Sequence, residues 1–360
     1  MPEPAGSIKP LRARGAALPP LARFLLLRTI TTIALVWLAA SSMLLLVRLA
    51  PGWAPDNWKP GMSSEEIARE RARLGLDQPW TTYYGEWIGH AVRLDFGAST
   101  RYQRPVVDLV AERAMNTALL ALSALFVATL IGLPLGVIAG SGRPASAAAA
   151  IRFLSTLFLS APPLLTSLIL AWFAARTGWF PIGGMRDVNV DQFDAIGRLR
   201  DVIWHLALPM TALALPLAAT FERLQADAIE TVRAEPFVVA ALARGVPSWR
   251  VLWRDLWRLA LGPVVALYGL AAGHLLSGAL AVEFVSSWPG LGRLMFEALG
   301  TRDLPLAAGC AAAAALFLGV WTMLSDLALR LVDPRLREAD TRERHEPASP
   351  ETALPEPQPW

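Results

Sequence analysis

Three ionisable side chains, His274, Glu283 and Asp326, lie within or at the ends of long apolar stretches. Such groups are costly inside a bilayer, so each is a candidate for function. Glu283 and Asp326 stand at the ends of their stretches, where solvation or helix capping would also explain them. His274 stands nearer the middle of its stretch. Two interpretations stay open for it, a place in the lining of a pore and a hydrogen bond between helices.

Motifs for catalysis or nucleotide binding are missing from the sequence. The chain has no Gly-x-x-x-x-Gly-Lys-Ser/Thr phosphate loop, no His-Glu-x-x-His and no Gly-x-Ser-x-Gly. The 4 histidines are scattered, and the 1 cysteine, Cys310, lies in an apolar run. A disulfide within the chain and a cysteine-based metal site are therefore excluded. We expect no catalytic, cofactor-binding or metal site on this chain.

The composition points to lipid as the main solvent. Hydrophobic residues make up 54% of the chain and charged residues 18%, against about 25% charged residues in a typical soluble domain. The mean hydropathy is +0.41. The formal net charge is only +3, which does not suggest a nucleic acid as partner.

Six stretches free of Asp, Glu, Lys and Arg are long enough to cross a bilayer as helices. They are Thr29–Val47, Ala114–Gly142, Phe153–Ala175, Val202–Phe221, Leu259–Val282 and Leu304–Ser325. The sequence therefore predicts an all-α integral membrane protein with six transmembrane helices. The first stretch exceeds the apolar core of a typical signal peptide, about 7–15 residues, so we expect it to be retained.

These stretches define the expected organisation of the chain. It comprises a cytoplasmic tail (1–21), a first span (22–50), an external segment with short helices (51–111), a core (112–332) and a disordered tail (338–360). Within the core we expect spans at 115–141, 153–176, 202–222, 260–283 and 304–326, and a loop at 233–259. Five basic residues precede the first span and two follow it. This bias favours an N-terminus, and after six spans a C-terminus, in the cytoplasm.

The long polar segment Glu222–Arg258 carries the most information. Pro236 and Pro247 each mark a helix start, with Gly245 between the two helices. Aromatic and cationic stripes run along the second helix, formed by Trp249, Trp253 and Trp257 and by Arg250, Arg254 and Arg258. Such a helix can lie on the membrane or dock into another protein, and the two interpretations are compatible. Glu222-Arg223 is expected to anchor the fourth span at the interface.

A second sequence signal lies in the external segment. Ser63-Ser64-Glu65-Glu66 is typical of a capping box that opens a short helix, and Gly75 is placed to end it.

Several blocks, in order along the chain, resemble one family of proteins. Ala240–Pro247, followed by Arg254 and Pro263, is similar to the "EAA loop" of ABC importer permeases in its peptide-permease form. Glu283–Leu294 and Arg302–Pro305 are similar to the family's "PGlGrL" and "RDyP" blocks. Further similar blocks are Arg48–Gly52, Leu74–Pro79, Leu94–Ser99, Asn116–Leu120, Ser160–Pro163, Gly178–Pro181 and Asp333–Arg337. The chain thus resembles the permease subunits of dipeptide, oligopeptide and nickel ABC importers.

The resemblance implies a fold, partners and site residues. The fold would be the type-I ABC importer permease fold with cytoplasmic coupling helices, in the inner membrane of a bacterium. The partners would be a second homologous permease, two cytoplasmic ATPase subunits that bind ATP and Mg²⁺, an extracytoplasmic solute-binding protein and membrane lipid. The ATPase-coupling residues would be Ala240, Ala241, Arg244, Gly245, Arg254 and Pro263. The external or pore-side motif would be Glu283, Trp288, Pro289, Gly290, Gly292, Arg293, Arg302 and Asp303, with His274 as a pore residue.

The sequence departs from the family pattern at several positions of the coupling segment, among them Val239, where many members have Glu, and Gly262, where a bulkier residue is usual. Asp255 stands where the family usually has His, and Leu259 where it usually has Asn. These departures put the detailed fit to the ATPase in question.

The alternatives to an import permease are a self-sufficient secondary transporter or channel and an integral membrane enzyme. A secondary transporter is disfavoured because the six spans show no inverted repeat and carry few buried charges that could bind coupling ions. A membrane enzyme is disfavoured because the sequence has no catalytic motif. The resemblance allows small peptides, nickel chelates or some glycosides as cargo. Short peptides are expected from their prevalence in the family.

Overall fold

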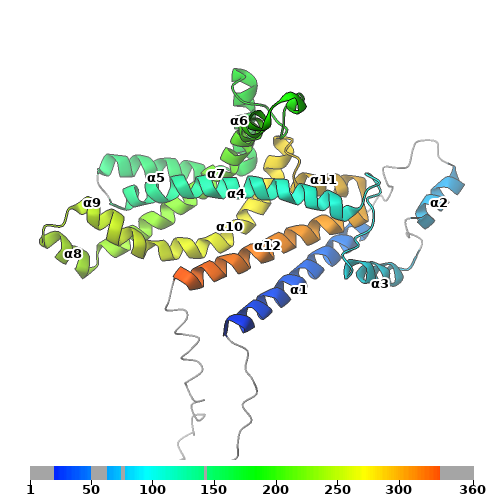
Figure 1. Cartoon of the computed structure of the whole chain (residues 1–360), viewed down its shortest axis with the longest axis horizontal. Helices are drawn as coiled ribbons and strands as arrows, with labels where there is room; N and C mark the ends of the chain where they lie inside the picture. The colour runs from blue at the N-terminus through cyan, green and yellow to red at the C-terminus, as the bar shows by residue number, and fades with distance from the viewer. Residues whose placement is uncertain (1–19, 50–62, 74–77, 142–143, 333–360) are drawn as a thin grey trace, which may run out of the picture.

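The computed structural model describes residues 20–49, 63–73, 78–141 and 144–332. The expected tails, the Asp333–Arg337 block, Pro51-Gly52 and Gly75 lie outside these residues. The described elements are helical, as predicted (Figure 1). The α-helices are α1 (Pro20–Leu49), α2 (Ser64–Arg73), α3 (Trp80–Ala91), α4 (Val106–Ser141), α5 (Ala145–Ser160), α6 (Pro163–Thr177), α7 (Ala195–Arg233), α8 (Pro236–Ala243), α9 (Ser248–Arg250), α10 (Trp257–Val285), α11 (Leu291–Thr301) and α12 (Leu304–Val332). A 3-10 turn (Val190–Gln192) and a π-helical segment (Val251–Leu256) complete them.

Five helical stretches among the described residues are long and apolar enough to cross a membrane. They correspond to α1, α4, α7, the continuous stretch Ser248–Val285 and α12. The pair α5 and α6 makes a sixth if it is taken as one span, but it is bent by 102°. The prediction of a single helix across Phe153–Ala175 was therefore wrong.

The bend between α5 and α6 has a local cause. Proline disfavours helical backbone in the residue before it, and two prolines follow one another here. Ala161 and Pro162 are extended, with ψ angles of 113° and 144°, and Pro163 then starts α6 at its first position. In Figure 1 α6 leaves the direction shared by α4 and α5.

Glycines join α4 to α7 at a four-residue spacing. A Cβ atom added to Gly132, Gly136 or Gly140 would lie 2.5–2.6 Å from the backbone oxygens of Ala218, Glu222 or Ala226, respectively. Small residues at this spacing let two membrane helices approach closely. Phe221, fully buried beside this contact, stacks on Tyr268 of α10 with ring centroids 5.1 Å apart. The contact of α4 with α7 therefore forms the centre of the larger apolar core.

The first and last spans pack together at the other side of the molecule. In Figure 1 α1 and α12 run side by side. An ion pair joins Arg28 of α1 to Asp326 of α12, and Gly319 lets Thr32 approach α12 closely. Asp326 is thus partnered by a basic residue of a neighbouring span. The ion pair adds to the solvated role considered for Asp326, whose side chain remains 31% exposed.

The helix capping predicted for the external segment is confirmed at α2. The backbone N–H of Ser63 donates to Glu66 Oε2 at 2.8 Å, and the backbone N–H of Glu66 donates to Ser63 Oγ at 3.3 Å. These two reciprocal hydrogen bonds satisfy donors that an uncapped helix start leaves free.

The helix that follows Gly245 continues into the fifth span. The sequence predicted a separate helix ending near Leu259. The structure instead runs from α9 through the π-helical segment into α10 without a break, 38 residues from Ser248 to Val285. At about 1.5 Å per residue such a rod is roughly 55 Å long.

Candidate functional site

Glu283 forms the centre of a buried polar site at the end of α10. Its side chain is fully buried. Oε1 accepts a hydrogen bond of 2.6 Å from Thr117 Oγ1 of α4, and Oε2 accepts one of 3.1 Å from the backbone N–H of Arg293. Thr117 Oγ1 in turn accepts from the backbone N–H of Leu291 at 2.7 Å. The solvated role considered for Glu283 was therefore wrong, because the side chain is buried. The capping role is borne out, because the carboxylate accepts from a backbone N–H in the first turn of α11.

The loop between α10 and α11 is clamped to α4 by a second pair of bonds. Trp288 is fully buried, and its indole Nε1 donates to the backbone oxygen of Asn116 at 3.1 Å. Asn116 Nδ2 donates back to the backbone oxygen of Pro289 at 2.8 Å. A side chain at Gly290 is excluded, because its Cβ would lie 2.1 Å from Glu283 Oε1.

A second glycine, in the first turn of α11, faces α10. A Cβ at Gly292 would lie 2.7 Å from Leu280 Cα. We refer to Thr117, Glu283, Trp288, Gly290 and Gly292, with the bonds that join them, as the Glu283 anchor.

Asp303 holds a second buried contact, between α12 and the loop before α4. Its side chain is fully buried. Oδ2 accepts from Ser99 Oγ at 2.6 Å and from the backbone N–H of Arg101 at 3.2 Å, while Oδ1 accepts from the backbone N–H of Leu306 at 3.1 Å. Arg302, just before it, ends α11 in the left-handed conformation with φ 55°. The Asp303 carboxylate thus caps α12 and also holds the loop before α4.

A partly exposed network of hydrogen bonds joins α11 to the loop before α4. Tyr102 donates a short hydrogen bond to Glu297 Oε2, and Arg293 Nε lies 3.1 Å from Glu297 Oε1. Burial, and then the bond to Glu297, raises the pKa of Tyr102. Burial alone would raise the pKa of Glu297, but the bonds from Tyr102 and Arg293 outweigh it and hold that pKa below its usual value.

At the opposite end of the rod, α8, Gly245 and the helical segment to Leu256 form a compact knob, here called the Gly245 segment (Pro236–Leu256). Gly245 has φ +82°, which L side chains rarely adopt. It redirects the chain from α8 into α9. Val238, Ala241, Val251 and Leu256 are buried against the end of α7 and Val137 of α4. The knob is thus packed onto the membrane helices as one unit.

The outer surface of the Gly245 segment is apolar, aromatic and basic. Its exposed side chains include Val239 (61% exposed), Trp249 (63%) and Trp253 (43%). Ala240, Arg244 and Arg254 are also exposed, whereas Ala241 is buried. The π-helical turn alters the four-residue spacing of the tryptophans, and Trp257 packs inward while Trp249 stays outside. Trp253 and Trp257 stay in contact, with ring centroids 5.8 Å apart, so the Trp stripe predicted from the sequence is kept between these two residues.

His274 lies on an exposed face of α10. Exposed positions recur along this helix at alternating steps of three and four residues, and they are Pro263, Ala266, Leu270, Gly273, Ser277, Leu280 and Phe284. His274 is exposed beside Gly273. Its imidazole has no hydrogen-bond partner in the described part of the chain. The interhelical bond considered for it is thus not formed there.

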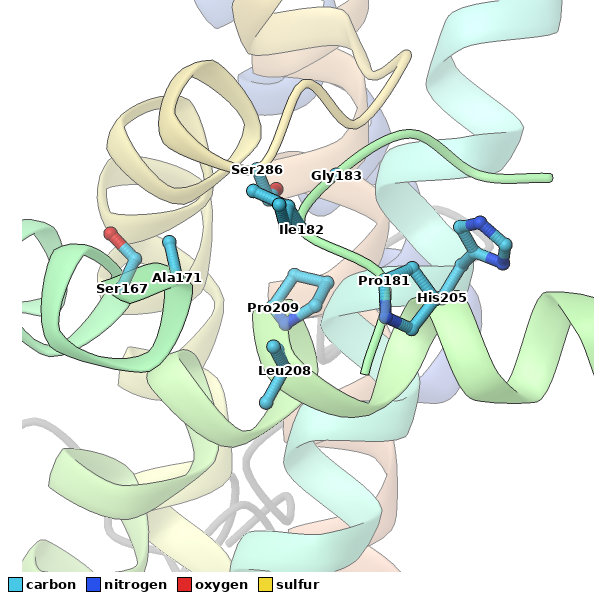
Figure 2. Close-up of a pocket in the computed structure, with 9 residues that line it drawn as sticks. All are labelled: Ser167, Ala171, Pro181, Ile182, Gly183, His205, Leu208, Pro209 and Ser286. Atoms are coloured by element: carbon cyan, nitrogen blue, oxygen red, sulfur yellow. The ribbon is translucent and has the colours of Figure 1, made fainter. Parts of the chain in front are cut away.

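The loop between α6 and α7 packs beside Ser286, as Figure 2 shows. Pro181, Ile182 and Gly183 lie over α7 and beside Ser286. The N–H of Gly184 donates to the Ser286 oxygen at 2.8 Å, and His205 Nδ1 lies 3.0 Å from Asp201 Oδ1. The cavity they enclose has a volume of only about 10 Å³, which is roughly the space for one water molecule. We therefore do not assign a substrate to it.

Sequence reasoning missed the partners of these buried groups. Asn116 and Thr117 belonged to a noted motif, but their pairing with Glu283 and Trp288 spans about 170 residues of chain. Ser99 and Tyr102 were not singled out as partners of the α11–α12 region. A hydroxyl or amide beside an apolar run is a signal for such a partner, because a buried carboxylate requires donors. Its specific partner follows only from the packing.

Residues 132–338 match the family model described as "Binding-protein-dependent transport system inner membrane component". A protein of Brucella ovis, named as a peptide permease, is 34% identical over 81% of this chain and 92% of its own length. The "Oligopeptide transport system permease protein AppB" of Bacillus subtilis is 29% identical over 88% of this chain and 99% of its own length. A solved inward-facing MetNI methionine ABC transporter is similar at a TM-score of 0.47 and 16% identity, over 63% of this chain and 97% of the other. This last likeness is too weak to carry an argument.

Proposed function

The chain belongs to the family of binding-protein-dependent transport system inner membrane components, and from this premise we propose that it forms half of the pore through which an importer takes up short peptides. It is a multi-pass inner-membrane protein and a permease subunit rather than the enzyme of its system. Peptides are proposed as cargo because the similar proteins of Brucella ovis and Bacillus subtilis are named for peptides and oligopeptides.

The continuous rod Ser248–Val285 is the observation that carries the mechanism. One end of the rod leaves the Gly245 segment, and the other holds Glu283, which fixes α11. We infer that a push on the Gly245 segment is passed along α10 to the Glu283 anchor, since the helix between them is unbroken. In an importer, this linkage would couple ATPase closure to the pore and to the opposite face.

The exposed face of α10 supports a second permease as partner. A strict three–four spacing keeps Leu270, Gly273, Ser277 and Phe284 on one side of the helix. A histidine directed at lipid would be costly, and a water-filled pore between two permeases removes that cost. His274 would then line the pore.

The remaining partners follow from the same proposal. Two ATPase subunits, which bind ATP and Mg²⁺, would contact the aromatic and basic surface of the Gly245 segment. A solute-binding protein would contact the external side near α11. The N- and C-termini would lie in the cytoplasm, as the basic residues before the first span favour.

A reconstituted complex tests this proposal. The chain is combined in lipid vesicles with a partner permease, ATPases and binding protein, and ATP hydrolysis is measured with and without a peptide-loaded binding protein. We expect the loaded binding protein to stimulate hydrolysis in the native complex and not in Gly245→Arg. Gly245→Asn is the matched control, because Asn tolerates the left-handed backbone at this position.

Two results would contradict the proposal. Full stimulation of the Gly245→Arg complex would place the coupling contact elsewhere. Transport by this chain alone, with no ATPase present, would favour a self-sufficient transporter. A binding protein that stimulates hydrolysis only when loaded with a nickel chelate would replace the peptide as cargo and leave the permease role intact.

A further inference from the structure

A cavity of about 270 Å³ opens between α5 and α7, apart from the site described above. It is larger than the cavity in Figure 2 and is lined by charged and hydroxyl side chains. The polar residues that line it are Arg152, Ser155 and Thr156 of α5 and Glu222, Arg223 and Asp227 of α7. In Figure 1 the two helices lie close together.

Glu222 is the buried group in this cavity. It was expected to anchor the span at the interface, but only 2% of the residue is exposed. Its Oε1 atom has no hydrogen-bond partner in the described part of the chain. An acceptor left without a donor in a buried site is unfavourable, and this is more severe for a carboxylate than for a neutral group. Glu222 lines the cavity, so a ligand with an N–H donor that entered it would offset part of the cost of burying this carboxylate.

The cavity lies at the level where lipid headgroups lie. Arg152 is the last charged residue before the charge-free run of the third span, and Glu222 is the first after the run of the fourth. Because both residues line one cavity, the ends of the two runs come to the same depth. A span meets the lipid headgroups at the end of its charge-free run, so a phospholipid headgroup is a candidate occupant of this cavity.

The charges around the cavity are balanced in sign. Two guanidinium groups, Arg152 and Arg223, and two carboxylates, Glu222 and Asp227, line it. Arg152 also pairs with Glu230 on α7, which holds it toward that helix. Arginine suits phosphate, and carboxylates suit an ammonium group. A ligand with both charges is complementary to this arrangement.

We propose that this cavity binds a phosphoethanolamine headgroup, with the phosphate at Arg152 and Arg223 and the primary ammonium at Glu222. A primary ammonium has three N–H donors, whereas the trimethylated ammonium of a choline headgroup has none. The site should therefore select ethanolamine over choline lipids. The inference is independent of the cargo and of which side of the membrane carries α8.

The test measures lipid binding to the purified full-length chain in detergent by native mass spectrometry. The probes are dioleoyl phosphatidylethanolamine, its mono- and dimethylated forms, phosphatidylcholine and phosphatidylglycerol. For the native chain we expect roughly tenfold tighter binding of the ethanolamine lipid than of phosphatidylcholine, the factor that one charge-assisted hydrogen bond supplies. Phosphatidylglycerol, which has no ammonium group, should bind as weakly as phosphatidylcholine.

Two variants identify the residues. Glu222→Gln keeps the size of the side chain and should bring the ethanolamine-to-choline ratio close to one. Glu86→Gln on the exposed face of α3 is the matched control and should leave that ratio unchanged. Arg223→Gln should weaken both lipids alike, because both carry the phosphate. Circular dichroism checks that each variant is folded.

Equal binding of the two lipids to the native chain would overturn the proposal, and so would an unchanged ratio in Glu222→Gln. Free O-phosphoethanolamine, added as competitor, distinguishes the sources of the headgroup. Displacement of the lipid supports recognition of the headgroup alone, from a soluble or a lipid source. No displacement supports the bilayer lipid as the ligand.

Discussion

The Glu283 anchor makes a quantitative prediction at Thr117, which is 3% exposed. Its hydroxyl donates to Glu283 Oε1 at 2.6 Å and accepts from the Leu291 N–H at 2.7 Å. Thr117→Val keeps the shape and removes both bonds. A buried N–H left without an acceptor costs about 1–3 kcal/mol, and a hydrogen bond to a charged group contributes about 1.5–3 kcal/mol. With partial relaxation, we expect a loss of about 3 kcal/mol in the free energy of unfolding.

Thr117→Ser is the matched control for this change. It keeps the hydroxyl and loses one buried methyl group, worth about 0.8 kcal/mol. A loss of 1 kcal/mol lowers the unfolding midpoint by about 2–4 °C in a domain of about 150–250 residues, and by an amount near the lower value in larger chains. The Thr117→Val variant should therefore unfold about 6 °C below the native chain. The Thr117→Ser variant should unfold about 2 °C below it.

The single cysteine provides the assay. Cys310 is free and fully buried in α12, so a thiol-reactive fluorescent dye labels it only as the chain opens. The purified chain is heated in detergent with the dye, and the midpoint of the fluorescence rise is compared among the native chain, Thr117→Val and Thr117→Ser. If Thr117→Val and Thr117→Ser unfold at the same midpoint temperature, the two hydrogen bonds do not stabilise the fold, and the role given to the Glu283 anchor is wrong.

Three further predictions follow from the same structure. Gly290→Ala should lower the dye midpoint and the stimulation by loaded binding protein, because the new Cβ would lie 2.1 Å from Glu283 Oε1; a native-like variant would refute the close packing. Gly136→Ala should cost about 1–3 kcal/mol, since its Cβ would lie 2.6 Å from Gln225 Cβ, whereas Gly85→Ala, with no atom within 4 Å, should be neutral or stabilising. The lowered pKa of Glu297 adds stability that is present above the usual glutamate pKa and lost as the pH falls through the lowered value. Tyr102→Phe should therefore unfold at a lower temperature than the native chain at neutral pH, and this difference should shrink as the pH falls through the lowered pKa of Glu297; a difference that does not change with pH would exclude the pairing.

Much of the fold could be predicted because hydropathy depends on local composition. The charge-free runs at Thr29–Val47, Val202–Phe221 and Leu304–Ser325 lie within helices α1, α7 and α12. The capping box at Ser63 and Glu66 was also predictable, because both of its hydrogen bonds join residues three apart. Both signals need only neighbouring residues, and the folded chain does not alter them.

The candidate site was only half visible in the sequence. The resemblance drew attention to Glu283, Gly290 and Asp303 but did not give their roles. Ser99 donates to Asp303 across 204 positions, and Thr117 donates to Glu283 across 166. No local pattern encodes a pairing over such distances, because it depends on which helices pack together.

The sequence by itself determined that this chain is an all-helical membrane protein, since the number and length of uncharged runs follow from the cost of charge and free backbone groups in lipid. It also located Gly245 between two helix starts. Only the tertiary structure decided that the helical stretch from Ser248 to Val285 is continuous and that Glu283 is buried. The physical reason is that burial and helix continuity are set by contacts between segments, such as α4 against α7, and these contacts exist only once the helices have packed.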